Sequence, residues 1–509
     1  MPITLVLLTI GALLLTSVTR FGCHHDDREN QSSVNMAGDD ESDVFVGVPS
    51  AYNDLYGTIV FLGALFLLGD VVCQKCLRIV PSLVGHIVVE MVLGPEGFDW
   101  IQPSPEQWVL LGNLGLLLLI VQAGLEMDIQ VLRLVGLRGV VIAVVGSVLP
   151  ISIGTGLVAA TMPSLAFKNA LAAGCSFGPT SAGIAMNVLG QCGVLQRPVG
   201  QLIVAAAIVD DILALVVLSQ LRALTGETTA VADIVLPIVS AVSWLVLGGT
   251  IALVVFPKLY NPTLTYVLSN SRLEENKREQ VAPYVSLACL LVMLLGLLPA
   301  TFYTEASYLL GAFLSGLAFC QDEGGLNALF ARQFKRLIQW LLKVFFAATI
   351  GFQVPFRSFS SWDVIGRGLV LVAALTGKLA VGFLAPNLET QRQQREGPGR
   401  FRGRHLRDCF VVGFSMMGEA EFAFVVAVFG LTEGLIPSNL YASIVLAILL
   451  STVISPLLLR STLALFPYDD DEEEKEEKKK AADDDKERPA EEPMETHSGG
   501  DAVDDERGA

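Results

Sequence analysis

Apolar runs of about 20 residues recur from residue 55 to residue 465, and this feature most limits how the chain can fold. A helix of that length spans the hydrocarbon core of a bilayer, which is about 30 Å thick. Only 17% of the 509 residues are charged, whereas roughly a quarter are charged in an ordinary soluble protein. The 47 glycines suit close contacts between membrane helices. The sequence therefore predicts an all-α polytopic membrane protein.

The two ends of the chain have a different composition. Residues 1–23 begin with a short apolar core, which we interpret as a signal peptide, with a short membrane anchor as the alternative. Residues 24–54 are acidic, and residues 469–509 hold 19 acidic and 7 basic residues. Both segments lack an apolar period, so we predict an acidic extracytosolic segment at 24–54 and a disordered tail at 466–509. The transmembrane domain then occupies residues 55–465.

Loop charges predict how the domain is oriented. The apolar pattern predicts 13 transmembrane helices after the leader. With the N-terminus outside, most loop lysines and arginines fall on the cytosolic side, including the arginines between residues 392 and 407. This distribution follows the positive-inside rule and places the tail in the cytosol. The pattern leaves open whether the protein lies in the plasma membrane or an internal membrane.

Two of the predicted helices contain sequences that interrupt helical hydrogen bonding. The fifth, at 168–190, includes "CSFGPTSAGIA", and the twelfth, at 408–430, includes "FSMMGEAEFAF". Pro179 removes a backbone donor from the first of them. Interrupted helices at corresponding places in two halves are typical of transporters built from inverted repeats. We therefore expect two broken, crossing helices, with a simple packing kink as the alternative for each.

Asp210 and Asp211 lie side by side at the centre of the apolar run 202–221. A carboxylate at this depth costs about 2.5–3.5 kcal/mol on insertion scales, so we expect it to be paired or functional. Successive helix residues point about 100° apart, so one aspartate can face a cavity while the other reaches a neighbouring helix. A cavity carboxylate that holds either a proton or a small cation would support exchange between the two.

Lys378 is the one basic residue deep in a later apolar run, and we expect it to pair with the aspartate that does not face the cavity. The alternative is that its side chain reaches the membrane interface. Glu419 and Glu421, in the second broken helix, are further candidates for ion binding.

These features resemble the cation:proton antiporter-2 family, within the sodium/proton exchanger superfamily. The resemblance is carried by "PSLVGHIVVEMVLGP" (81–95), "LIVQAGLEMD" (119–128), "FGPTSAGIAMNVLGQCGVLQRPVGQLIVAAAIVDDILAL" (177–215), "FFAATIGFQV" (345–354), "GK" (377–378) and "EAEFAFVVAVFG" (419–430). It implies a fold of inverted repeats with a dimerisation half and a mobile core half, assembled as a homodimer. It also implies that Asp211 carries the cation or proton and that Asp210 pairs with Lys378. Thr180 and Ser181 would offer oxygens to the ion.

The resemblance indicates the identity of the transported cation less directly than it indicates the exchange activity. Relatives with paired aspartates are generally sodium/proton exchangers, whereas the Kef-type potassium branch has Gln at the position of Asp210. The stretch "EFAFVVAVFG" is closer to the Kef type, so potassium/proton exchange is the alternative, and lithium is a further candidate ion. Glu419-Ala420-Glu421 stands where many relatives carry Arg-Gly-Glu. The usual glutamate of the second span is replaced by His86, with Glu90 one turn later.

Aspartates within membrane helices also occur in two other classes of protein. An intramembrane aspartyl protease needs aspartates on two helices, one of them in a GxGD motif, and the chain contains no GxGD. A channel or a transport-dead sensor is the second alternative, although a buried aspartate–lysine pair argues against a passive pore. We expect no enzyme activity, no cofactor, no resident metal and no nucleic-acid partner.

Overall fold

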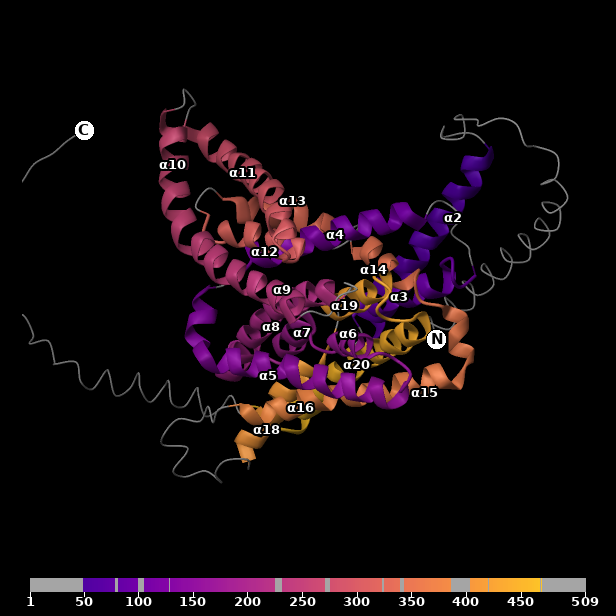
Figure 1. Ribbon diagram of the computed structural model, residues 1–509. Coiled ribbons are helices and arrows are strands. Elements are labelled where there is room, and N and C mark those ends of the chain that lie inside the picture. The colour runs from indigo at the N-terminus through magenta and orange to yellow at the C-terminus, as the bar shows by residue number, and fades with distance from the viewer. Residues whose placement is uncertain are drawn as a thin grey trace, which may run out of the picture.

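The computed structural model describes residues 49–77, 81–98, 105–127, 129–224, 231–270, 275–322, 325–338, 343–385, 403–419, 421–466 and 468. Within these ranges every regular element is a helix, which confirms the predicted all-α class (Figure 1). The predicted signal peptide, the acidic segment as far as residue 48, and the tail from residue 469 lie outside the described residues.

The described helices fall into three groups along the chain. The first group is α2 (Pro49–Leu65), π-helical η1 (Phe66–Leu77), α3 (Ser82–Leu93), α4 (Pro105–Leu125), α5 (Ile129–Thr161), α6 (Phe167–Cys175), α7 (Ala182–Gln191) and α8 (Pro198–Leu224). The second is α9 (Val231–Ser243), η2 (Trp244–Gly248), η3 (Ile251–Val255), α10 (Phe256–Asn270), α11 (Glu275–Tyr303), α12 (Tyr308–Ala318) and α13 (Leu326–Leu337). The third is α14 (Lys343–Gly351), η5 (Phe356–Ser360), α15 (Trp362–Leu371), η6 (Val372–Leu375), α16 (Thr376–Val381), η7 (Gly382–Leu384), α18 (Gly403–Met417), α19 (Glu421–Thr432) and α20 (Ser438–Leu465).

Many of these helices are long and apolar enough to cross a membrane. Among the described residues there are 8 such helices, and the bent pair α18–α19 makes up to 9. Two shorter apolar helices, α3 and α12, add to the apolar elements. This content confirms a polytopic protein, while the count of 13 crossings stays a prediction.

The helices form two sides with a middle layer between them. In Figure 1, α4, α12 and α14 lie along one side, and α5, α16 and α18 lie along the other. Between them lie α6, α7, α8, α19 and α20. The packing agrees with this view, because α4 packs on α12 and α14, whereas α5 packs on α6, α8 and α16. The helices α6, α7 and α19 and the aspartate pair on α8 therefore lie in the middle layer.

Two glycines bring α4 and α12 into backbone contact. A Cβ at Gly124 of α4 would lie under 3.0 Å from the carbonyl oxygen of Phe313, and a Cβ at Gly316 of α12 would lie as close to the carbonyl oxygen of Val121. The contact is reciprocal, since each helix offers a glycine to the backbone of the other. Small residues at membrane helix contacts allow this approach.

We expect alanine at Gly316 to destabilise the protein, because the added methyl group must push the two backbones apart. Overpacking of this kind costs about 1–3 kcal/mol. The measurement is the melting temperature of the purified protein in detergent. Gly296→Ala is the matched control, since no atom lies within 4 Å of a Cβ at that position of α11. Equal melting temperatures for Gly316→Ala and Gly296→Ala would contradict the packing argument.

Candidate functional site

Both interrupted helices are broken where the sequence predicts. The first stops at Cys175 and resumes at Ala182, so that α6 and α7 are separated by a short segment of turn and irregular backbone. The second stops at Met417 and resumes at Glu421, and its two parts are bent by 40°. The first break contains Pro179, which cannot donate a backbone hydrogen bond.

The two breaks are hydrogen-bonded to each other. The backbone N–H of Ser181 donates to the carbonyl oxygen of Gly418 at 2.7 Å. The Thr180 hydroxyl donates to the carbonyl oxygen of Met416 at 3.1 Å. The Ser181 hydroxyl also accepts from the backbone N–H of Ile184 and so caps α7. Each break therefore supplies partners for backbone groups that the other has left unpaired, as irregular backbone within a membrane requires.

The two adjacent aspartates of α8 have different surroundings. Asp210 is fully buried, and its carboxylate accepts a hydrogen bond from the Ser147 hydroxyl of α5. Asp211 is only partly buried and lines a cavity. The angle between successive helix residues produces this division. Asp211 is thus the aspartate that an ion in the cavity can reach.

Lys378 has a close partner that the sequence did not predict. Its ammonium lies 3.4 Å from Glu419 Oε1 and donates to the carbonyl oxygen of Pro179 at 2.5 Å. Asp210 accepts a hydrogen bond from Ser147 and lies within electrostatic reach of Lys378, so the predicted pairing of Asp210 with Lys378 stays a prediction beside the closer Glu419 contact. The break between α18 and α19 places the Glu419 carboxylate beside the lysine. Both side chains of the Lys378–Glu419 pair are fully buried, so the interface alternative for Lys378 is wrong.

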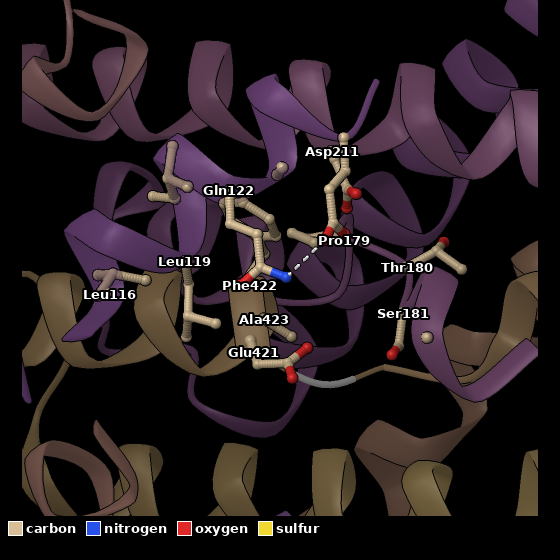
Figure 2. A pocket seen from close by; sticks show the side chains of 14 residues that line it. Leu116, Leu119, Gln122, Pro179, Thr180, Ser181, Asp211, Glu421, Phe422 and Ala423 are labelled. Carbon is tan, nitrogen blue, oxygen red and sulfur yellow. Dashed lines mark hydrogen bonds between the residues drawn. The ribbon is translucent and has the colours of Figure 1, made fainter. Parts of the chain in front are cut away.

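A cavity of about 210 Å³ adjoins both broken helices. Its wall comes from α4, the α6–α7 break, α8 and the start of α19 (Figure 2). Three carboxylates line it, from Glu126, Asp211 and Glu421. Among the described residues, no lysine, arginine or histidine lines this cavity. The cavity is therefore suited to a cation.

Oxygen atoms from the first break complete the wall. Thr180 and Ser181, which the resemblance implies as oxygen donors to the ion, line the same cavity as Asp211. Figure 2 shows Asp211 and Glu421 at opposite sides of the space, with Gln122 extending from α4 beside them. Carboxylate, hydroxyl and carbonyl oxygens are the ligands that hard cations take in proteins.

Glu90 lies away from this cavity. Glu90 is fully buried on α3. It packs closely on α14, because a Cβ added at Gly351 would lie 2.5 Å from the Cβ of Glu90. Neither oxygen of its carboxyl group has a hydrogen-bond partner among the described residues. The structure does not bring this candidate to the aspartate pair.

Two residues of the cavity wall, Gln122 and Glu126, were not predicted. They belong to the stretch "LIVQAGLEMD", which supported the resemblance without being assigned a role. Glu126 directly follows α4. The hydropathy pattern therefore predicts only that Glu126 lies at the end of a membrane span, and gives no indication of a binding site. The spacing of four residues on one helix face was the available signal.

Comparison with known proteins agrees with this geometry. Residues 60–465 match the family of the transmembrane sodium/hydrogen exchanger. The Na(+)/H(+) antiporter of Enterococcus hirae is 27% identical over 391 residues, which cover 75% of this chain and 91% of that protein. The Na(+)/H(+)-K(+) antiporter GerN of Bacillus cereus is 25% identical over 389 residues, which cover 75% of this chain and 90% of that protein.

The fold is also similar to that of a solved structure. The sodium proton antiporter MjNhaP1 from Methanocaldococcus jannaschii superposes with a TM-score of 0.56, at 17% sequence identity, over 80% of this chain and 99% of that chain. With its apolar helices, the protein is an integral multi-pass membrane protein. The family match spans most of the chain, so the protein belongs to the transmembrane sodium/hydrogen exchanger family.

Proposed function

We propose that this protein exchanges sodium ions for protons across a membrane, with Asp211 as the carrier. The observation that carries the proposal is the cavity at the crossing of the broken helices, which is lined by carboxylates and which Asp211 faces. A carboxylate that binds a proton or a cation, but not both, couples the two fluxes once access to it alternates between the two sides. The family is one of transporters, so the intramembrane protease alternative is set aside.

The other members of the site have supporting roles in this proposal. Glu421 faces the same cavity, so an entering cation meets a second carboxylate there. Thr180 and Ser181 supply uncharged oxygens. Asp210, held by Ser147 behind the cavity wall, adds negative charge to the site without direct access to the ion. The protein needs no cofactor for such exchange.

The Lys378–Glu419 pair is proposed to hold the crossing together. Lys378 reaches the carbonyl oxygen of Pro179 in one break and the Glu419 carboxylate in the other. An ammonium in that position compensates the negative charges around it and fixes the two breaks relative to each other. We therefore assign Glu419 to this pair rather than to ion binding.

Sodium is the proposed cation, and potassium is the second candidate. The named activity of the Enterococcus hirae relative supports sodium, and that of GerN supports both ions. Between sodium and potassium, the paired aspartates favour sodium, because the resemblance associates this pair with sodium/proton exchangers. A pH-sensitive dye inside reconstituted vesicles, scanned over sodium, lithium and potassium, separates them.

A homodimer in a lipid bilayer completes the proposal. Little of the apolar spans Leu236–Tyr266 and Gln280–Tyr303 is buried within the protein, so their surfaces must meet lipid or a second copy. The resemblance implies a dimerisation half, and these exposed apolar surfaces fit a second copy there. Glu90, away from the cavity, is left without a role in exchange.

The carrier assignment predicts that Asp211→Asn abolishes cation-driven proton movement. Asparagine keeps the size and polarity of the side chain but cannot take up and release a proton. The rate in reconstituted vesicles should fall to that of vesicles without protein, while the protein remains folded by size-exclusion chromatography. Asp363→Asn, an exposed aspartate in the first turn of α15, is the matched control and should exchange normally. A normal rate in Asp211→Asn would move the carrier role to Glu421.

The buried pair predicts a pattern of stabilities. Lys378→Gln leaves a buried carboxylate unpaired, and breaking such a pair costs about 3–5 kcal/mol. The double variant Lys378→Gln with Glu419→Gln leaves no charge behind and should melt at a higher temperature than Lys378→Gln alone. The two single variants and the double variant form a double-mutant cycle, in which residues in contact show a coupling energy of about 0.5–3 kcal/mol. A double-mutant cycle that combines Lys378→Gln with Asp210→Asn should show a smaller coupling energy than the cycle with Glu419→Gln. A larger coupling energy would identify Asp210 as the main partner of Lys378.

The proposed orientation predicts where tags can be reached. A tag after Gly47 should lie outside the cytosol, and a tag at Gly499 should lie within it, because the basic loops and the tail share the cytosolic side. Antibody labelling before and after permeabilisation measures both positions, with a cytosolic protein as the control. Both tags on one side would contradict the 13-span topology.

A further inference from the structure

The solvent-facing end of the cavity, called its outer end below, carries an ion pair that the proposed exchange cycle does not use. Glu126 is exposed, whereas Asp211 and Glu421 are partly buried, so Glu126 marks the end of the cavity nearest the solvent. Its Oε1 accepts from the Lys335 ammonium at 2.8 Å and from the Gln122 side-chain amide at 3.1 Å. One oxygen of this carboxylate therefore takes both donors.

Two other oxygens at this place have no hydrogen-bond donor. Gln122 is 9% exposed, and its Oε1 has no hydrogen-bond partner among the described residues. Glu126 Oε2 accepts no hydrogen bond from those residues either. Both side chains line the cavity. A buried carbonyl oxygen without a donor is costly, and a cation would satisfy it.

Lys335 reaches this place from a separate surface helix. It lies on α13, which buries Leu326, Leu329 and Phe330 and exposes much of its other face. The side chains of Lys335 and Glu126 are 37% and 46% exposed. Exposed pairs contribute about 0–1 kcal/mol, so little free energy is needed to separate these two residues. The lysine ammonium is a positive charge that a free cation can replace.

We propose that Gln122 and Glu126 form an outer binding site for a monovalent cation on the path to Asp211, and that Lys335 neutralises this site until a cation displaces it. The inference rests on the proposed function, because it names a step that precedes binding at Asp211. A carboxylate at the entrance of a cavity of like charge raises the local cation concentration and the rate of entry. The pair with Lys335 limits this attraction when no cation is present.

The test compares the sodium concentration that gives half-maximal exchange in reconstituted vesicles. Glu126→Gln removes the charge and should raise that concentration by about three- to tenfold. This factor is smaller than the gain in association rate that a whole charged cleft provides, because only one charge is removed. Gln122→Leu removes the unpaired oxygen and should raise it as well. Lys335→Gln removes the competing ammonium and should lower it by a similar factor. The maximal rates should change little.

Arg332→Gln is the matched control, since Arg332 is an exposed cation on the same helix that makes no contact with Glu126. It should leave the half-maximal concentration unchanged. If Lys335→Gln raised that concentration, the pair would be a structural clamp and the proposal would be overturned. The same conclusion would follow if Arg332→Gln lowered it as much as Lys335→Gln, or if Glu126→Gln left it unchanged.

A binding measurement separates this proposal from the carrier assignment. Ligands that bind the folded state raise its melting temperature, so sodium chloride is compared with choline chloride on the purified Asp211→Asn variant. Sodium should still raise the melting temperature of Asp211→Asn, and the rise should be lost when Glu126→Gln is added. Retained exchange by Asp211→Asn would overturn the carrier role alone. An equal sodium effect with and without Glu126→Gln, or no effect in Asp211→Asn, would overturn the outer site alone.

Discussion

The backbone N–H of Ser181 donates to the carbonyl oxygen of Gly418 across two helices that are both interrupted at that point. In a bilayer there is no water to pair with the backbone groups that a broken helix releases. The breaks can therefore exist only where they find partners, and here each finds them in the other. Lys378, which donates to the carbonyl oxygen of Pro179, strengthens the same junction. The cavity and the aspartate pair are positioned by this crossing.

The acidic residues near the crossing differ in role because they differ in neighbours. Asp210 is bonded to Ser147, and Glu419 is paired with Lys378, so both are committed to protein groups. Asp211 and Glu421 face the cavity instead. Four carboxylates close together repel one another unless cations or donors intervene. Pairing two of them within the protein reduces this repulsion at the cavity, where Asp211 and Glu421 lie.

The two lysine–glutamate pairs of this site differ mainly in burial. Lys378 and Glu419 are both fully buried, and separating them would leave an uncompensated charge in a medium of low dielectric constant. Lys335 and Glu126 are about two-fifths exposed, so water and salt weaken their attraction. The first pair suits a permanent junction, and the second suits a contact that opens and closes. Contacts of the same chemistry thus act differently at the centre and at the entrance of the cavity.

The sequence by itself determined the features that depend on local chemistry. The apolar runs required membrane helices, Pro179 required a break, and adjacent aspartates on one helix had to point in different directions. Tertiary structure alone decided that Glu419 forms an ion pair with Lys378, in addition to the electrostatic interaction between Lys378 and Asp210. It also brought Gln122 and Glu126 to the cavity, and Lys335 to Glu126 from 209 residues further along the chain. The physical reason is that the strength of an ion pair depends on distance and burial, and both follow from how distant helices pack rather than from the order of residues along the chain.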